Sequence, residues 1–277
     1  MIENKKIAFI GGGQMGEAIF SGMIASGKVS PDHIVVTDIS QERLSFLKEK
    51  YGVGTVCNDV ENNGAVQAVS QSDIVVFAIK PQFARSVLGC VCKKFRPQQL
   101  VISIMGGITL DYLKEYFPEN PVLRVMPNTP MLVRKGIAGI AAGEKATKED
   151  CDLGIELFNL VGISYLLPEN LIDPLTSVSG CSPAFAYLFI EAMADGGVEK
   201  GLPRNMAIQL AAQALAGSAE MVLQTGKHPG ELKDSVCSPA GSTIVGVHAL
   251  ERGGFRNTVM NAITESCDKM IEVGKKA

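Results

Sequence analysis

Short apolar runs alternate with amphipathic stretches over the first half of the chain. The runs are rich in β-branched residues and almost continuously apolar, which is typical of parallel strands buried on both faces of a sheet. Between them, apolar residues at three-and-four spacing predict crossover helices, so we expect a doubly wound α/β domain. The predicted strands are Ile7–Ile10, Ile34–Thr37, Ile74–Ile79, Leu100–Ile104 and Val122–Met126, and the predicted helices are Gln14–Ser26, Gln41–Lys50 and Leu110–Phe117.

The pattern changes near the middle of the chain. An apolar stretch at Ile163–Leu167 is a candidate last strand at one edge of the sheet. After Pro168, Ala-rich and Met-rich windows predict helices at Pro183–Ala194, Arg204–Gln224 and Asn257–Val273. We therefore expect two domains, an α/β domain over residues 1–166 and an all-helical domain over residues 167–277.

The window Met206–Ala219 carries few charges, so its helix is apolar over much of its circumference. One interpretation is a central helix buried within the domain. A domain of about 110 residues can hardly enclose so much apolar helix alone. We therefore expect this helix to be buried at a homodimer interface.

Composition and charge exclude several classes of protein. Of the 277 residues, 46% are hydrophobic and 20% are charged, as in a globular protein and unlike a disordered chain. The net charge of −3 supplies no general field for binding nucleic acid or an anionic membrane. The uninterrupted apolar runs are too short for a transmembrane helix, and the first predicted strand leaves no room for a signal peptide. We expect a cytoplasmic protein with no membrane or nucleic-acid partner.

The 7 cysteines are scattered and never form a zinc-like spacing, so we expect reduced thiols and no metal site.

The first predicted strand runs into a glycine-rich turn. Gly11, Gly13 and Gly16, with Gln14 and Met15 between the last two, form a G-x-G-x-x-G sequence that opens a helix. In this context the first glycine permits the tight turn, the second lets the backbone approach a pyrophosphate, and the third allows close helix packing. The helix N-terminus then faces the negative charge. The motif predicts a dinucleotide site, although glycine turns also occur for structural reasons alone.

Asp38 ends the second predicted strand, about 20 residues after the glycine motif, where a carboxylate can accept hydrogen bonds from ribose hydroxyls. The same charge repels the 2′-phosphate of NADPH. Of the two forms of NAD(P)H, the sequence therefore favours NADH. The alternative interpretation is a cap for the helix Gln41–Lys50. Arg43 lies close enough in sequence to reach a phosphate, which leaves NADPH open.

Two further strand ends are candidate cofactor contacts. Ala78, Lys80 and Pro81 follow a predicted strand at the carboxyl edge, where open α/β sheets bind ligands. Asn128 lies after another strand in a path stiffened by Pro127 and Pro130, which suits a loop against a nicotinamide. Both segments are also compatible with ordinary turns.

The helical half contains two segments rich in small and hydroxyl-bearing residues, Ser179–Phe185 and Pro229–Glu251. In the second, the backbone N–H groups of Gly241, Ser242 and Thr243 converge at a helix start, an anion site suited to a carboxylate. A plain capping loop is the alternative.

Taken together, these segments resemble pyrroline-5-carboxylate reductase over nearly the whole chain, from Lys6 to about Cys267. The resemblance implies a Rossmann domain followed by a helical dimerisation domain. It also implies reduction of L-1-pyrroline-5-carboxylate to L-proline with NAD(P)H, the last step of proline biosynthesis, in dimers that often assemble into larger rings. The substrate contacts that it implies are Ser238, Gly241, Ser242 and Thr243, and we include Ser235 of the same segment.

The chain departs from the family pattern in both helical-half segments. Cys181, Ser182 and Phe185 replace residues of the usual Ser-Gly-Ser-Gly-Pro-Ala-Tyr, and Ala240 replaces the first glycine of Ser-Pro-Gly-Gly. Ala240 matters if that position needs a positive φ, where Ala is penalised and Gly is not.

An imine needs little chemical help, because a protonated ring nitrogen makes its carbon accept hydride directly. Thr243 is the candidate catalytic residue, with its hydroxyl on the ring nitrogen, and Glu169 is a second residue expected near that nitrogen. A β-hydroxyacid dehydrogenase is an alternative, but it needs a base, commonly a lysine, and Pro183–Ala194 contains none. A nucleotide-sensing protein without turnover is another alternative, but it would not require an anion site at Ser238–Thr243.

Overall fold

The computed structural model describes residues 2–59 and 63–274, and the remainder of the two expected domain ranges lies outside the described residues. The chain forms two compact units, one comprising residues up to Gly180 together with those from Cys267 onward, and the other comprising Cys181–Ser266. The expected division at residue 166 follows the change from strands to helices along the sequence, and it stays a prediction.

The first unit is built on an eight-stranded sheet in the order β3-β2-β1-β4-β5-β6-β7-β8. Neighbouring strands pair in parallel except β6 and β7, which are antiparallel. This confirms the doubly wound, mainly parallel sheet expected from the sequence. The strands are β1 (Ile7–Ile10), β2 (Ile34–Asp38), β3 (Gly54–Cys57), β4 (Ile74–Phe77), β5 (Leu100–Ser103), β6 (Val122–Pro127), β7 (Gly136–Ala142) and β8 (Gly162–Leu166).

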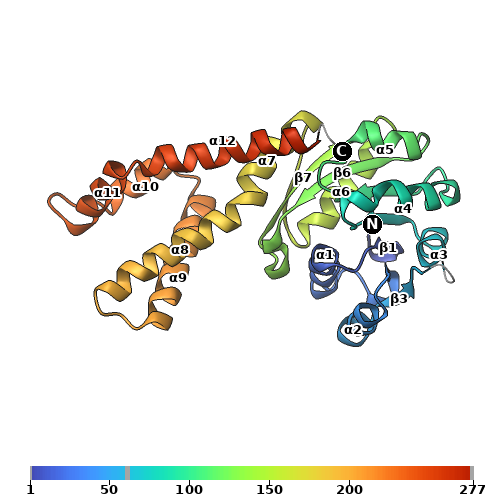
Figure 1. Cartoon of the computed structure of the whole chain (residues 1–277), viewed down its shortest axis with the longest axis horizontal. Coiled ribbons are helices and arrows are strands. Elements are labelled where there is room, and N and C mark those ends of the chain that lie inside the picture. The colour runs from blue at the N-terminus through green and yellow to red at the C-terminus, as the bar shows by residue number, and fades with distance from the viewer. Residues whose placement is uncertain (1, 60–62, 275–277) are drawn as a thin grey trace. The chain divides into compact units, whose positions relative to one another are not determined.

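Helices cover both faces of this sheet (Figure 1). Two apolar clusters result, because alternate strand residues point to opposite faces: Ile7 and Phe9 of β1 join one cluster, and Ala8 and Ile10 join the other. All four residues of β1, β4 and β5 are buried, as continuous apolar strands require. The helices of this unit are α1 (Gln14–Ala25), α2 (Gln41–Tyr51), α3 (Gly64–Gln71), α4 (Ala84–Val91), α5 (Leu110–Tyr116), α6 (Lys148–Asn159) and α7 (Ile172–Thr176).

The strand pattern was incomplete in two places. β3 and β7 were not predicted, because β3 is only partly buried and has Gly and Cys at its ends, and β7 consists mainly of Gly and Ala residues that carry little β signal. The edge strand near Ile163 is confirmed as β8, which pairs in parallel with β7.

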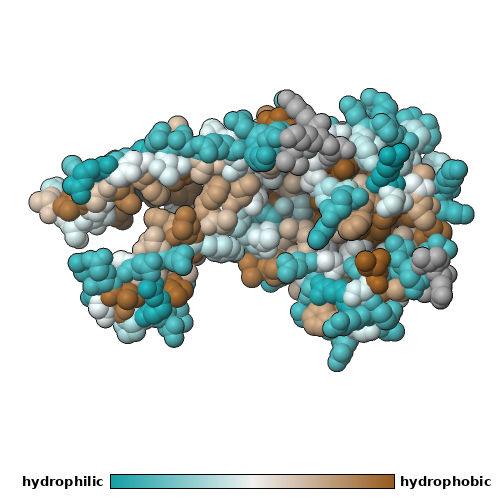
Figure 2. Space-filling view, viewed as in Figure 1, coloured by the Kyte–Doolittle hydropathy of each residue, from teal (hydrophilic) through white to brown (hydrophobic). Residues whose placement is uncertain are grey.

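The second unit contains α8 (Ser182–Glu199), α9 (Arg204–Thr225), α10 (Pro229–Ser235), α11 (Ser242–Arg252) and the start of α12 (Phe255–Gly274). α8 and α9 pack side by side (Figure 1). In the described part of this unit only Ala194, Ala207 and Ala211 are buried, so its large apolar side chains lie at the surface. Figure 2 shows apolar surface along these helices.

α9 is the one helix of the described ranges that is long and apolar enough, by length and composition alone, to cross a membrane. Only 11% of its apolar window is buried within the chain. The uninterrupted apolar runs considered in the sequence did not identify it, because Gln, Ser and Gly interrupt them.

The loop between α10 and α11 contains a strained residue. Ala240 has φ +58°, in the left-handed region where the family's glycine is favoured. A non-glycine residue there costs about 1–2 kcal/mol, whereas glycine costs about 0.5–1 kcal/mol through the entropy of the unfolded chain. Ala240 therefore has the positive φ at which alanine is less favourable than the glycine of the family pattern.

We predict that Ala240→Gly raises the free energy of unfolding by about 0.5–1 kcal/mol, since relief of strain exceeds the entropy loss. Thermal unfolding at one fixed protein concentration measures the change. Ala249→Gly, inside α11, is the matched control and should lower stability by about 1 kcal/mol. Equal destabilisation by both substitutions would contradict the prediction.

Candidate active site

The turn after β1 leaves no room for side chains at two of its glycines. Gly11 has φ +110°, and a Cβ there would lie 2.5 Å from the backbone oxygen of Ala78. A Cβ on Gly16 would lie 2.8 Å from the backbone oxygen of Gly11. These two glycines therefore permit the turn and the close start of α1.

Gly13 is different, because a Cβ there would meet no atom within 4 Å. Its φ of −67° is open to any residue, so the backbone does not require glycine. The open space in front of Gly13 is where a group can approach the backbone at the α1 N-terminus. This arrangement fits a pyrophosphate, for which the sequence motif predicts this glycine.

A cleft of about 510 Å³ lies at the carboxyl ends of β1, β2 and β4. Five of the predicted cofactor residues line it, namely Gly11, Gly13, Asp38, Ala78 and Lys80. The remaining lining residues are Ile10, Thr37, Ile39, Asn58, Ile79, Phe83, Ser86 and Val87. The structure thus brings the glycine turn, the acid at the end of β2 and the exit of β4 to one site.

Five predicted cofactor residues are not among the lining residues, namely Gln14, Met15, Gly16, Pro81 and Asn128. Gln14 is exposed as the first residue of α1, and Met15 packs partly against the core. Pro81 begins the short turn after Lys80. Their contacts with a cofactor stay predictions.

Several lining residues were missed in the sequence. Asn58 follows the unpredicted strand β3, and its backbone N–H donates to the Asp38 carbonyl oxygen at 2.8 Å. Thr37 is buried, and its Oγ1 has no hydrogen-bond partner in the described structure. A polar residue at the end of a buried strand was the available signal for Thr37, and an exposed aromatic after the β4 exit was the signal for Phe83.

Asp38 is bonded to the glycine turn. Its Oδ2 accepts the Gly12 N–H at 2.9 Å, and its Oδ1 accepts the Ser40 N–H at 3.0 Å. The α2 cap is Ser40, whose hydroxyl accepts the Arg43 N–H at 3.2 Å. The alternative interpretation, that Asp38 caps α2, is therefore wrong, because Ser40 is the N-cap.

Cys57 lies beside this region at the end of β3. Burial and a hydrogen bond with Asp59 raise the pKa of its thiol, so the sulfur stays protonated near neutral pH. In the ranges that the structure describes, no group of three His, Cys, Asp or Glu side chains could hold a metal ion.

Both polar atoms of the Asn128 amide make hydrogen bonds within the protein. Its Nδ2 donates to the Ser179 carbonyl oxygen at 2.9 Å, and its Oδ1 accepts the Ile137 N–H at 2.8 Å. The side chain is buried and joins the loop after β6 to the segment preceding α8. These bonds fix the orientation of the Asn128 amide, and its cofactor contact stays a prediction.

Glu169 belongs to an ion-pair cluster. Its Oε1 accepts the Leu110 N–H and an Arg124 Nη1–H, both at 2.8 Å. Arg124 is buried and also lies 3.5 Å from Asp173. This pairing positions Arg124 in the sheet, and the expected place of Glu169 beside the substrate stays a prediction.

The loop of the second unit has the geometry of a helix start. The Gly241 N–H donates to the Ser238 carbonyl oxygen at 3.0 Å, and a Cβ on Gly241 would lie 2.4 Å from Ser238 Oγ. Gly241 is the N-cap of α11 with no side-chain cap, so the N–H groups of Ser242 and Thr243 are not satisfied by a side chain there. These N–H groups can donate hydrogen bonds to an anion.

The hydroxyl groups around this loop differ in exposure and in their hydrogen bonds. The side chains of Ser238, Ser242 and Thr243 are exposed in the single chain. Ser235 lies at the end of α10, and its hydroxyl donates to the Leu232 carbonyl oxygen at 2.7 Å. Ser235 therefore caps its own helix, and its substrate contact stays a prediction.

The chain is similar to known proteins over its whole length. Residues 169–273 match the family model of pyrroline-5-carboxylate reductase dimerisation, and residues 6–107 match the model of coenzyme F420-dependent NADP oxidoreductase. The pyrroline-5-carboxylate reductase of Methanosarcina acetivorans is 44% identical over 276 residues, which cover 99% of this chain and 100% of that one. That of Escherichia coli is 41% identical over 272 residues, covering 98% and 99%.

Solved structures agree with these relatives. The Plasmodium falciparum pyrroline carboxylate reductase with NADP bound has a TM-score of 0.87 at 34% identity, covering 98% of this chain and 99% of that one. The pyrroline-5-carboxylate reductase of Coxiella burnetii has a TM-score of 0.88 at 32% identity, covering 97% and 98%. By identity and coverage together, the chain belongs to the pyrroline-5-carboxylate reductase family.

Proposed function

We propose that this protein reduces L-1-pyrroline-5-carboxylate to L-proline with a reduced nicotinamide dinucleotide, in the cytoplasm, as the last step of proline biosynthesis. The observation that carries the proposal is the glycine cradle in a cleft of a chain that is 44% identical to a pyrroline-5-carboxylate reductase along its full length. The fit of the cleft to a dinucleotide rests on the open space at Gly13 and the carboxylate of Asp38.

The cofactor, when bound, supplies the hydride. Gly13 and the α1 N-terminus would hold the pyrophosphate, and Asp38 would accept hydrogen bonds from the hydroxyl groups of the adenosine ribose. In the second unit the N–H groups at the start of α11 hold the substrate carboxylate. The Thr243 hydroxyl would contact the ring nitrogen, which takes a proton from solvent to become an iminium before the neighbouring carbon accepts the hydride. The chain needs no histidine for this step, because the iminium is already electrophilic.

We further propose that NADH is preferred over NADPH. Asp38 lines the cleft with a carboxylate, and a 2′-phosphate would add nearly two negative charges beside it. Arg43, the residue that could offset this repulsion, already bonds to Gly12 and Glu17.

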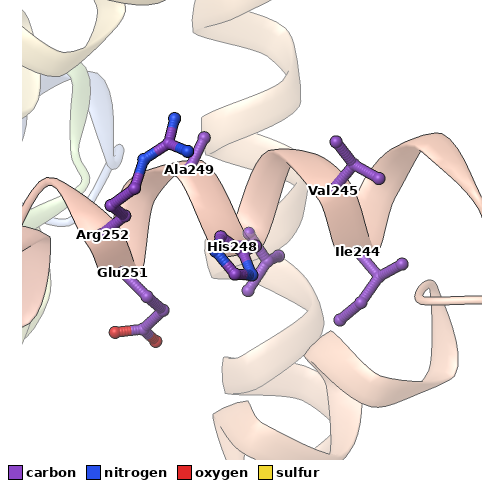
Figure 3. A pocket seen from close by; sticks show the side chains of 7 residues that line it. Ile244, Val245, His248, Ala249, Glu251 and Arg252 are labelled. Atoms are coloured by element: carbon purple, nitrogen blue, oxygen red, sulfur yellow. The ribbon is translucent and has the colours of Figure 1, made fainter.

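We propose that a second copy of the chain buries the exposed apolar helices of the second unit. A hollow of about 830 Å³ is lined by α11 alone, including Ile244, Val245 and His248, so its other wall is missing from the single chain (Figure 3). The match of residues 169–273 to a dimerisation model supports a homodimer, and larger rings of dimers extend the same proposal. Burial against a second copy also accounts for the apolar α9 without a membrane.

The deciding assay mixes purified protein, NADH and pyrroline-5-carboxylate, and follows loss of nicotinamide absorbance and formation of proline. A β-hydroxyacid dehydrogenase would oxidise a hydroxyacid with NAD⁺ and leave the imine unchanged. A nucleotide sensor would bind NADH without consuming it.

We predict that Thr243→Ala lowers kcat roughly ten- to a hundredfold, equivalent to about 1.4–2.7 kcal/mol, because a hydroxyl on the ring nitrogen is lost. The dissociation constant of NADH should not change. Thr243→Ser keeps the hydroxyl and is the control, so it should retain most of the turnover. Wild-type turnover in Thr243→Ala would exclude the assigned role.

We predict that kcat/KM is higher with NADH than with NADPH, and that Asp38→Ser moves this ratio toward NADPH by roughly tenfold, because it removes a like-charge contact. Steady-state rates with each cofactor test this. Asp32→Ser removes the same charge at the opposite end of β2 and should leave the ratio unchanged. A wild-type preference of tenfold or more for NADPH would refute the assignment.

We predict that Leu210→Glu yields monomers or aggregates, because it places a charge in the dimer contact of α9. Leu210 is 53% exposed in the single chain, so the substitution should not unfold one chain by itself. Light scattering measures the oligomeric state. Cys90→Glu adds the same charge to the exposed side of α4 and should remain dimeric. A stable dimer in Leu210→Glu would show that this residue faces solvent.

A further inference from the structure

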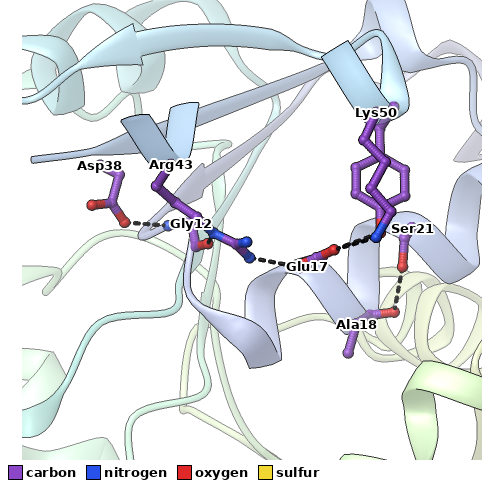
Figure 4. Close-up of polar contacts among 8 residues, drawn as sticks. Gly12, Glu17, Ala18, Ser21, Asp38, Arg43 and Lys50 are labelled. Carbon is purple, nitrogen blue, oxygen red and sulfur yellow. Dashed lines mark hydrogen bonds and ion pairs between the residues drawn. The ribbon is translucent and has the colours of Figure 1, made fainter. Parts of the chain in front are cut away.

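Glu17 lies at the centre of a charged cluster beneath the glycine turn. It is a buried acid on α1, and its two carboxylate oxygens accept hydrogen bonds from three residues of α2. Oε2 pairs with Arg43, while Oε1 accepts Tyr51 Oη–H at 2.5 Å and Lys50 Nζ–H at 3.1 Å (Figure 4). The cluster therefore fastens α2 to the first turns of α1.

Arg43 also bonds directly to the turn. Its Nε donates to the Gly12 carbonyl oxygen at 2.7 Å, while Asp38 accepts the Gly12 N–H at 2.9 Å. Both polar groups of Gly12 are thus held, one by Asp38 at the end of β2 and the other by Arg43 of α2 (Figure 4). The Arg43 guanidinium carbon lies 5.3 Å from the centre of the Phe46 ring, which adds a further contact.

An arginine in this part of a dinucleotide-binding domain ordinarily accommodates the 2′-phosphate of NADPH. Here the guanidinium is held through Nε at Gly12 and through Nη2 at Glu17, so turning it toward a phosphate would break at least one of these bonds. Separation from Glu17 would leave a buried carboxylate short of one charge-assisted hydrogen bond. Loss of the Gly12 bond would release the turn that the pyrophosphate contacts.

We propose that Glu17 is a specificity-determining residue, which holds Arg43 under the glycine turn and so withholds it from the 2′-phosphate of NADPH. The inference rests on the proposed dinucleotide function of the cleft. Glu17 acts through Arg43 and is a positioning residue, whereas Asp38 acts on the ribose directly. Together they make two independent contributions to the same preference, one by repulsion and one by holding back a cation.

The charge state of Glu17 supports this hold. Burial raises the pKa of this carboxyl, but hydrogen bonds from Tyr51, Arg43 and Lys50 outweigh burial and lower the pKa below its usual value. Glu17 is therefore ionised at neutral pH, and its pairing with Arg43 is complete where cofactor binding is measured.

The experiment measures dissociation constants of NADH and NADPH by fluorescence titration without substrate. We expect Glu17→Gln to improve NADPH binding relative to NADH by about tenfold, because the freed Arg43 can pair with the phosphate. The improvement should shrink as salt is raised. Adding Arg43→Gln to Glu17→Gln should abolish it. Tyr51→Phe removes a bond to Glu17 but keeps the Arg43 pair, so its NADPH to NADH ratio should match that of the wild type.

Arg43→Gln alone gives a second test that does not depend on the folding of Glu17→Gln. We expect it to weaken both cofactors by the same factor, since Arg43 supports the turn and does not contact the phosphate. Selective loss of NADPH binding would show that Arg43 already contacts the phosphate, which would overturn the inference. An unchanged ratio in folded Glu17→Gln, or equal weakening of both cofactors, would also overturn it.

The two proposals fail in different ways. If the wild-type protein binds neither NADH nor NADPH, the proposed function fails and the inference fails with it. If both cofactors bind and support proline formation, but the ratio of the NADPH and NADH dissociation constants does not change in Glu17→Gln, only the inference fails.

Discussion

The contact between Gly11 and Ala78 is the constraint on which the cleft beside the glycine turn depends. The Ala78 N–H donates to the Ile10 carbonyl oxygen at 2.9 Å, so the backbone just after β4 lies against the end of β1 and the chain must turn over it. Only a residue without Cβ permits that turn, and only a glycine at position 16 lets α1 begin so close to it. The α1 N-terminus and the open space at Gly13 follow from this start, and Asp38 and Arg43 then hold Gly12 from its two polar groups.

Sheet topology places the cleft at the same point for an independent reason. The chain builds outward from β1 to β2 and β3 on one side, then crosses to β4 on the other side of β1. The loops after β1 and β4 therefore leave in opposite directions, and a crevice opens between them at the carboxyl edge. Local glycine sterics and the order of strands thus agree on one site, which explains why five predicted residues from three separate segments line it.

The sequence predicted most strongly those features that depend on local pattern. The buried strands β1, β4 and β5 were predicted because they are almost continuously apolar, and the glycine turn because its spacing is specific. The partners of polar residues were beyond this reasoning, because they lie far apart in the chain. Asn128 bonds to Ser179 and Glu169 pairs with Arg124, so residues that look available in the sequence are engaged in the fold. Asn58 was missed with its strand, since the Gly and Cys ends of β3 weaken the strand signal.

The two units differ in how much of their apolar surface a single chain buries. The sheet unit has an apolar cluster on each face, whereas in the described part of the helical unit only three alanines are buried. Covering the exposed apolar helices by a second copy would make the stability of the helical unit depend on protein concentration, since folding and association are then linked. The cofactor cleft belongs to the unit that one chain completes, and the loop at Ser238–Thr243 belongs to the other. If this loop holds the substrate, as proposed, and a second copy stabilises its unit, dilution should reduce turnover before it reduces cofactor binding.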